Sequence, residues 1–119
     1  MEPILVGLQH GACLCGGVVF GLCASREPGP NRAMGTCDCS LCRRWSGAAE
    51  LPFVIVVPEH LTVDRGEELL AHYRDDEGRL RTFCRRCGSH LYYDTGRRYH
   101  VTAGVLDEAF NPDSRGGRL

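Results

Sequence analysis

The sequence predicts a mostly β domain built around cysteine knuckles that bind metal. Two observations carry this prediction. Seven of the eight cysteines fall into three tight clusters, and β-branched segments alternate with turns rich in glycine, proline and aspartate. A chain of 119 residues has room for a single hydrophobic core. We therefore expect one domain over residues 1–110, followed by a disordered tail at 111–119, where apolar residues are almost absent.

The first half of the chain predicts two strands and one helical turn. Residues 14–24 begin with a glycine turn and continue into a short strand, whereas the proline and glycine content of 25–32 is typical of a loop. Residues 41–45 fit one helical turn, with Ser40 as its N-cap. Residues 51–57 are strongly β-branched and bounded by prolines, which indicates a strand.

The second half predicts two hairpins. After a turn at 58–61, residues 66–73 and 80–83 read as strands joined by the turn Asp75-Asp76-Glu77-Gly78, whose acidic side chains we expect to be solvated. Residues 90–93 and 99–103 form a second pair of predicted strands around a turn at 95–98.

Charge and hydropathy exclude several classes of protein. The net charge is −1, with 14 basic and 15 acidic residues, so we expect no nucleic-acid partner. The sequence has no run of about 18 apolar residues, so we expect no membrane span. The N-terminus is acidic and too short for the apolar region of a signal peptide, so we expect the chain to stay in the cytoplasm, where thiols remain reduced. The oligomeric state stays open.

The cysteine spacing favours metal ligation over a disulfide framework or loose thiols. Thiolates two or three residues apart can converge on one zinc ion, with Zn–S bonds of about 2.3 Å. The clusters are a C-x-C at Cys13 and Cys15, a C-x-C-x-x-C at Cys37, Cys39 and Cys42, and a C-x-x-C at Cys84 and Cys87. Seven thiolates divide into four and three, which predicts two zinc ions per chain.

The outer pairs predict a closed structural site. Cys13 and Cys15 lie about seventy residues from Cys84 and Cys87 in the sequence, and a glycine follows each pair. Glycine suits a knuckle, because the backbone must approach the sulfurs with unusual dihedral angles. Four thiolates on one zinc would staple the N-terminal strand to a C-terminal hairpin and couple metal binding to folding.

The middle cluster predicts an open site. Cys37, Cys39 and Cys42 supply three ligands without an adjacent histidine, which leaves one position for an exogenous thiol or water. A metal there would act as a Lewis acid, and Arg43 with Arg44 would attract an anionic ligand. The alternative is a second structural site, completed by Cys23, Asp38 or a histidine.

The remaining candidates carry weaker signals. The five histidines have no metal-ligand spacing between them, and His90 is the best outsider because it follows the second knuckle. Trp45 suits either a pocket wall or core packing. Cys23 has no close cysteine partner and reads as a small buried strand residue. The histidines are His10, His60, His72, His90 and His100.

Over residues 10–108 the chain resembles the glutathione-dependent formaldehyde-activating enzyme (GFA) family, whose domain is also called CENP-V/GFA. The matching segments are GACLCGGVVF at 11–20, CDCSLCRRWSG at 37–47, YR at 73–74, RTFCRRCGSHL at 81–91 and AGVLD at 103–107. Asp38 stands where the family often has histidine.

The resemblance implies an Mss4-like, zinc-stabilised β-sandwich and assigns the two kinds of site. Cys13, Cys15, Cys84 and Cys87 would hold the structural zinc, and Cys37, Cys39 and Cys42 a catalytic zinc that can be labile. The family's activity is the addition of glutathione to formaldehyde, a carbon–sulfur lyase reaction that gives S-hydroxymethylglutathione. We therefore expect a zinc enzyme that joins or separates a low-molecular-weight thiol and a small aldehyde.

Two other functions fit the same residues. One is a non-catalytic, zinc-stabilised protein-interaction module with two inert metals. The other is a redox or metal-buffering protein, whose middle cluster cycles through disulfides.

Overall fold

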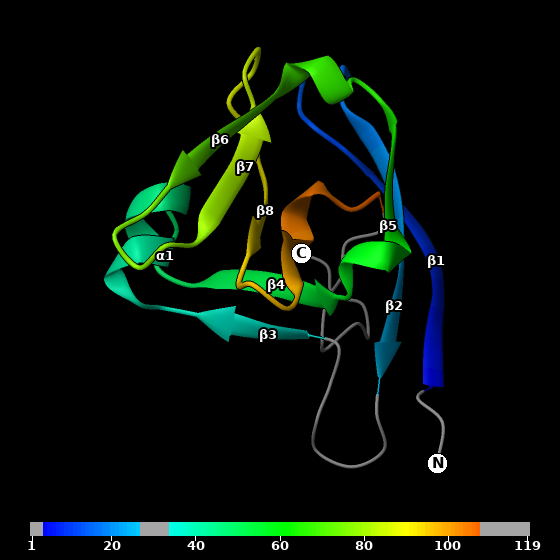
Figure 1. The fold of residues 1–119 in the computed structure, drawn as a ribbon, viewed down its shortest axis with the longest axis horizontal. Coiled ribbons are helices and arrows are strands. Elements are labelled where there is room, and N and C mark those ends of the chain that lie inside the picture. The colour runs from blue at the N-terminus through cyan, green and yellow to red at the C-terminus, as the bar shows by residue number, and fades with distance from the viewer. Residues whose placement is uncertain (1–3, 27–33, 108–119) are drawn as a thin grey trace.

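Two antiparallel β-sheets form the fold in the computed structural model, which describes residues 4–26 and 34–107 (Figure 1). Most of the predicted loop at 25–32 and all of the predicted tail at 111–119 lie outside the described residues. The elements are β1 (Ile4–Ala12), β2 (Val19–Arg26), β3 (Met34–Cys37), α1 (Ser40–Ser46), β4 (Leu51–Val56), η1 (Pro58–His60), β5 (Leu61–Arg65), η2 (Glu67–Leu69), β6 (Leu70–Arg74), β7 (Leu80–Cys84), β8 (His90–Asp94), β9 (Tyr99–Thr102) and η3 (Ala103–Val105).

The two sheets differ in size and in what packs against their faces. The smaller sheet has the order β1-β2-β5, and the larger has the order β3-β4-β9-β8-β7-β6. In Figure 1 the smaller sheet stands along one side of the larger, and α1 lies at the opposite side, near the ends of β6 and β7. The larger sheet therefore has one face toward the smaller sheet and another available to the helix.

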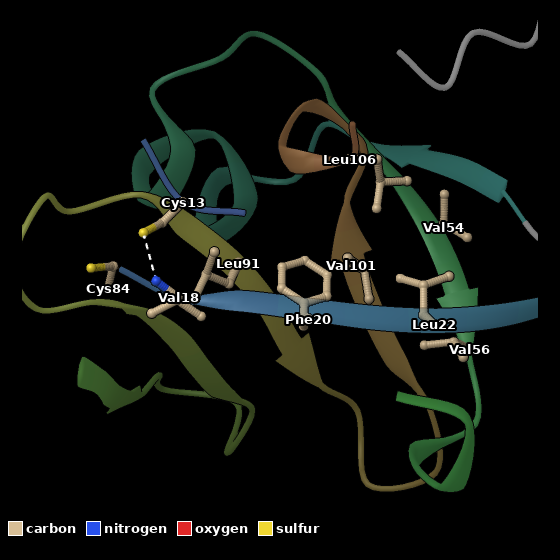
Figure 2. Packing of buried hydrophobic residues seen from close by; sticks show 10 residues of the cluster. All are labelled: Cys13, Val18, Phe20, Leu22, Val54, Val56, Cys84, Leu91, Val101 and Leu106. Carbon is tan, nitrogen blue, oxygen red and sulfur yellow. Dashed lines mark hydrogen bonds between the residues drawn. The ribbon is translucent and has the colours of Figure 1, made fainter. Parts of the chain in front are cut away.

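The main core fills the space between the sheets. Val18, directly before β2, and Phe20 and Leu22 within it are fully buried, in keeping with the two-residue period of a strand. Figure 2 shows them facing residues of the larger sheet, Val54, Val56, Leu91 and Val101. The same cluster includes Cys13 and Cys84, so its outer end adjoins a cysteine knuckle.

A second, smaller core lies between the larger sheet and α1. Cys42 of the helix packs with Leu51 and Tyr93, and Trp45 and Cys37 pack against them. Directly paired residues of adjacent strands share a face. The register pairs Tyr93 with Arg81 on one side and with His100 on the other, so these three side chains face the helix together.

The mostly β prediction is confirmed, and the described elements refine it. The short strand expected within 14–24, after its glycine turn, and the strands expected at 51–57, 80–83, 90–93 and 99–103 correspond to β2, β4, β7, β8 and β9. The segment at 66–73 is instead a 3₁₀ turn followed by β6, because Gly66 takes a left-handed conformation with φ of 88°. Neither β1 nor β3 was predicted.

The helix at the middle cluster starts with a different cap from the one expected. Cys39, not Ser40, is the N-cap of α1, and its sulfur accepts a hydrogen bond from the Cys42 amide. The prediction of Ser40 as the cap is wrong by one residue. Within the described residues, no helix has the length and apolar character needed to cross a membrane.

Candidate metal centres

The outer cysteine pairs meet at one end of the main core. One ligand atom from each of Cys13, Cys15, Cys84 and Cys87 lies within 4.8 Å of every other. The sulfurs of Cys13 and Cys15 are 3.5 Å apart, and those of Cys15 and Cys84 are 3.9 Å apart. A tetrahedral ZnS₄ unit with bonds of about 2.3 Å has sulfurs about 3.8 Å apart. The four cysteines therefore fit a closed zinc site.

Backbone amides and polar side chains surround these sulfurs. The Val18 amide donates to Cys13 Sγ at 3.2 Å, as Figure 2 shows, and the Arg86 amide donates to Cys84 Sγ at 3.4 Å. The Cys15 amide donates to Cys87 Sγ at 3.4 Å. Donors of this kind stabilise thiolates over thiols, so the knuckle backbones are arranged for anionic sulfur.

The pKa values of two outer thiols are lowered by their neighbours. The Ser89 hydroxyl, 3.2 Å from Cys87 Sγ, is the main reason that the pKa of Cys87 falls to about 5. The Gly17 amide and the Arg86 guanidinium lower the pKa of Cys15. Thiolate is the form that binds zinc, so these contacts keep Cys15 and Cys87 in the form suited to metal binding.

The middle cluster spans the end of β3 and the start of α1. Cys37, Cys39 and Cys42 bring their sulfurs within 4.8 Å of one another, with 3.4 Å between the sulfurs of Cys37 and Cys39. Cys42 is fully buried, Cys37 is half-buried and Cys39 is exposed. The set therefore has one side in the protein and one side toward solvent.

Three sulfurs converge here. The residues considered as a fourth ligand, which were Cys23, Asp38 or a histidine, do not join them. Among the described residues, no further His, Cys, Asp or Glu atom lies within 4.8 Å of all three sulfurs. Cys23 instead lines a cavity of about 430 Å³ on the smaller sheet, together with His10 and His60. The geometry fits a cation with three protein ligands and one position left for another molecule.

Without a cation, ionisation of Cys37 in the middle cluster is unfavourable. Burial, followed by the effect of Cys42 and Cys39, raises the pKa of Cys37 to about 11. None of the eight cysteines forms a disulfide, so the three sulfurs of the middle cluster are close to one another without being bonded. A divalent cation would allow the three sulfurs to ionise together, because it lowers the pKa of a coordinating thiol.

A buried ion pair stands behind Cys42 and was not predicted. Arg81 Nε donates to Asp75 Oδ2 at 2.9 Å, and both terminal nitrogens of Arg81 lie 3.8 Å from Cys42 Sγ. The Tyr93 hydroxyl lies 3.7 Å from the same sulfur and 3.0 Å from His100 Nδ1. The expectation of a solvated acidic turn is wrong for Asp75, which is buried, and holds for Asp76 and Glu77, which are exposed.

The other sequence candidates lie around the middle cluster or away from it. Trp45 packs at the small core, where its ring is 4.6 Å from that of His90 and 5.0 Å from the Arg81 guanidinium. His90 also lines an open cavity of about 360 Å³ beside the end of α1. His72 bonds Thr82 at 2.9 Å. No histidine among the described residues joins a cysteine cluster.

One comparison with known proteins identifies a family, and another finds a similar solved structure. The sequence profile of the glutathione-dependent formaldehyde-activating enzyme family matches residues 8–115. A crystal structure of a Rhodobacter sphaeroides protein is similar, with a TM-score of 0.69 and 29% sequence identity over 91% of this chain and 95% of that one. No curated protein matches the chain. The profile match includes both cysteine clusters.

Proposed function

The chain belongs to the glutathione-dependent formaldehyde-activating enzyme family, and on this premise we propose that it is a zinc-dependent carbon–sulfur lyase. It joins or separates a low-molecular-weight thiol, with glutathione as the first candidate, and a small aldehyde such as formaldehyde. The catalytic domain spans residues 1–110. The reaction takes place in the cytoplasm, where glutathione keeps thiols reduced.

The observation that carries this proposal is the unequal number of donors in the two clusters. Four sulfurs meet in the outer cluster and three in the middle one. A closed set of four ligands is typical of structural zinc, whereas catalytic zinc keeps one position for substrate or water. We therefore assign a structural zinc to Cys13, Cys15, Cys84 and Cys87, and a catalytic, exchangeable zinc to Cys37, Cys39 and Cys42.

The three cysteines of the middle cluster would hold the zinc ion and thereby orient the incoming thiol. Cys42 fixes the site to the core, and the exposed Cys39 lies on the side from which a thiol can approach. When bound, zinc supplies a Lewis acid that favours the thiolate form of an incoming thiol. In the forward reaction a carbon–sulfur bond forms between that thiol and the aldehyde carbon, and the carbonyl oxygen takes up the thiol's proton. The reverse reaction breaks the same bond.

Two arginines provide positive charge next to this approach. Arg43 and Arg44 lie in the last turn of α1 and are exposed. The Nε of Arg43 donates to the Asp38 carbonyl at 3.0 Å, which ties one guanidinium to the loop of the cluster. We propose that Arg43 and Arg44 attract the carboxylates of glutathione, since guanidinium groups pair well with carboxylates.

The test is the rate at which the protein equilibrates glutathione with formaldehyde. Exchange NMR on isotope-labelled formaldehyde measures this rate above the uncatalysed reaction. We expect catalysis by the zinc-loaded protein, its loss in Cys39→Ser, and its retention in Cys23→Ser, whose residue belongs to neither cluster. Equal rates with and without the wild-type protein would reject the proposal, and a folded two-zinc protein without activity would favour an interaction module.

A further inference from the structure

Arg81 carries a buried charge, and its role in the β6–β7 hairpin does not account for all the contacts of this charge. Its side chain is 1% exposed, although it belongs to a strand close to the surface helix. A buried charge is costly unless it is paired and its donors are used. The contacts of its guanidinium therefore indicate what the residue is for.

The guanidinium has two differently occupied edges. The Nε edge donates to Asp75, whose other carboxylate oxygen accepts bonds from the Glu77 and Arg79 amides at 2.9 Å each. The opposite edge presents two nitrogens to one atom, Cys42 Sγ, at 3.8 Å. A salt bridge that only closed the β6–β7 hairpin would need the first edge and not the second.

Aromatic rings fix the plane of this group. The Arg81 guanidinium carbon lies 5.0 Å from the centroid of Trp45 and 4.6 Å from that of Tyr93. Both distances are within the range of cation–π attraction. Asp75 at one end and the two rings at its side hold the guanidinium in one orientation. In that orientation its terminal nitrogens point at Cys42 Sγ.

We propose that Arg81 is a positioning residue for the catalytic metal, acting through Cys42. It supplies the positive charge and the N–H donors that the buried sulfur lacks from solvent, so that Cys42 stays the fixed ligand. Cys37 and Cys39 then form the side that opens to the incoming thiol. This inference rests on the proposed function, and its test measures metal binding rather than turnover.

The probe is Co²⁺ at the middle cluster of the full-length, zinc-loaded protein. Mild chelation first removes the exchangeable zinc, and Co²⁺ is then titrated in. Sulfur-to-cobalt charge-transfer absorption reports the ligands, and quenching of Trp45, the single tryptophan, reports that the metal has entered the adjacent cluster. Arg81→Met removes the charge. Asp75→Asn is the matched control, because it breaks the same ion pair while the rings of Trp45 and Tyr93 still hold the guanidinium beside Cys42.

We expect Arg81→Met to weaken Co²⁺ binding by about 10-fold to 100-fold, the usual effect of removing a partner of a metal ligand, and to shift the charge-transfer band. Asp75→Asn should lower Tm to a similar extent while its Co²⁺ affinity and band stay near those of wild type. If Arg81→Met does not fold, Arg81→Lys takes its place, since it keeps the charge but has one nitrogen for two partners. It should bind Co²⁺ more weakly than Asp75→Asn does.

Two results would overturn the inference alone: unchanged Co²⁺ affinity in the Arg81 variant, or equal losses in that variant and in Asp75→Asn that follow Tm. Wild-type protein that takes up no Co²⁺ at the middle cluster would overturn the inference and the proposed function together.

Discussion

At the scale of single residues, Cys39 caps the helix and is also one of the three ligands that we propose for the catalytic zinc. Its sulfur accepts the Cys42 amide as the N-cap of α1, and the same sulfur lies 3.4 Å from that of Cys37. Serine is a good N-cap but a poor zinc ligand next to thiolates. Replacement by serine therefore separates the two roles.

We predict that Cys39→Ser lowers the zinc content from two ions per chain to one and leaves thermal stability nearly unchanged. Cys39→Ala should lose the same zinc and, without a cap, about 1 kcal/mol of stability in addition. Metal analysis and thermal denaturation of the two variants measure these effects. Two zinc ions retained in both variants would show that Cys39 is not a ligand.

His100 predicts a pH dependence of stability. Burial, with a smaller effect of Arg79, lowers the pKa of His100 from 6.5 to about 4. Between these values the unfolded chain binds more protons than the folded one, so stability rises with pH through this window and is lost as pH falls. Each unit of pKa shift corresponds to about 1.4 kcal/mol, which limits the effect to about 3 kcal/mol.

We expect His100→Phe to flatten the dependence of unfolding free energy on pH between 4 and 6.5, relative to wild type. Urea denaturation at several pH values measures the slope. His60→Phe is the control, because His60 is exposed and lies on the other sheet's cavity. A slope in His100→Phe equal to that of wild type would mean that another group dominates.

At the scale of elements, the entry to η2 depends on two glycines in close contact. Gly66 has a φ of 88°, and a Cβ at this position would collide with the Gly17 carbonyl oxygen and with the backbone of Val18. This contact holds the glycine turn after Cys15 against the end of β5. The outer knuckle and the smaller sheet are thereby joined.

We predict that Gly66→Ala destabilises the fold by several kcal/mol, clearly more than Gly96→Ala. Gly96 also has a positive φ, 97°, but its Cβ would point into open space, so its cost is the dihedral strain alone, about 1–2 kcal/mol. Chemical denaturation of both variants gives the difference. Equal losses would show that the Gly17 contact yields without cost.

The elements differ in how far their sequences reveal them. The run LPFVIV of β4 is rich in β-branched residues, with Pro52 near its start and Pro58 shortly after its end, so the sequence alone predicts this strand. In β1, ILVGLQHGA contains two glycines and shows no alternation, and β3 has only four residues. Their pairing with β2 and β4 forms these strands, and such long-range pairing has no local signal.

At the scale of the whole molecule, the cysteine spacing was the most informative part of the sequence. It predicted both groups of residues that the fold brings together, because ligands for one metal recur at short intervals. The Asp75–Arg81 pair could not be predicted in this way. The position of this pair next to Cys42 depends on the strand register that turns Arg81 toward the helix. Register is a property of the assembled sheet.

The outer cluster connects distant parts of the chain. Cys13 and Cys15 follow β1, whereas Cys84 ends β7 and Cys87 precedes β8. We therefore predict that Cys84→Ser, which also disturbs a fully buried core position, prevents stable folding at any zinc concentration. Circular dichroism and proteolysis measure the outcome. A cooperative unfolding transition close to that of wild type would contradict a structural role for this cluster.

The most direct test of a closed site beside an open one is the zinc content of the reduced protein, before and after mild chelation. We predict that two zinc ions per chain fall to one, that the circular dichroism spectrum stays unchanged, and that re-added zinc returns to the middle cluster. Two zinc ions that resist chelation together, or that leave together as the fold is lost, would contradict this prediction.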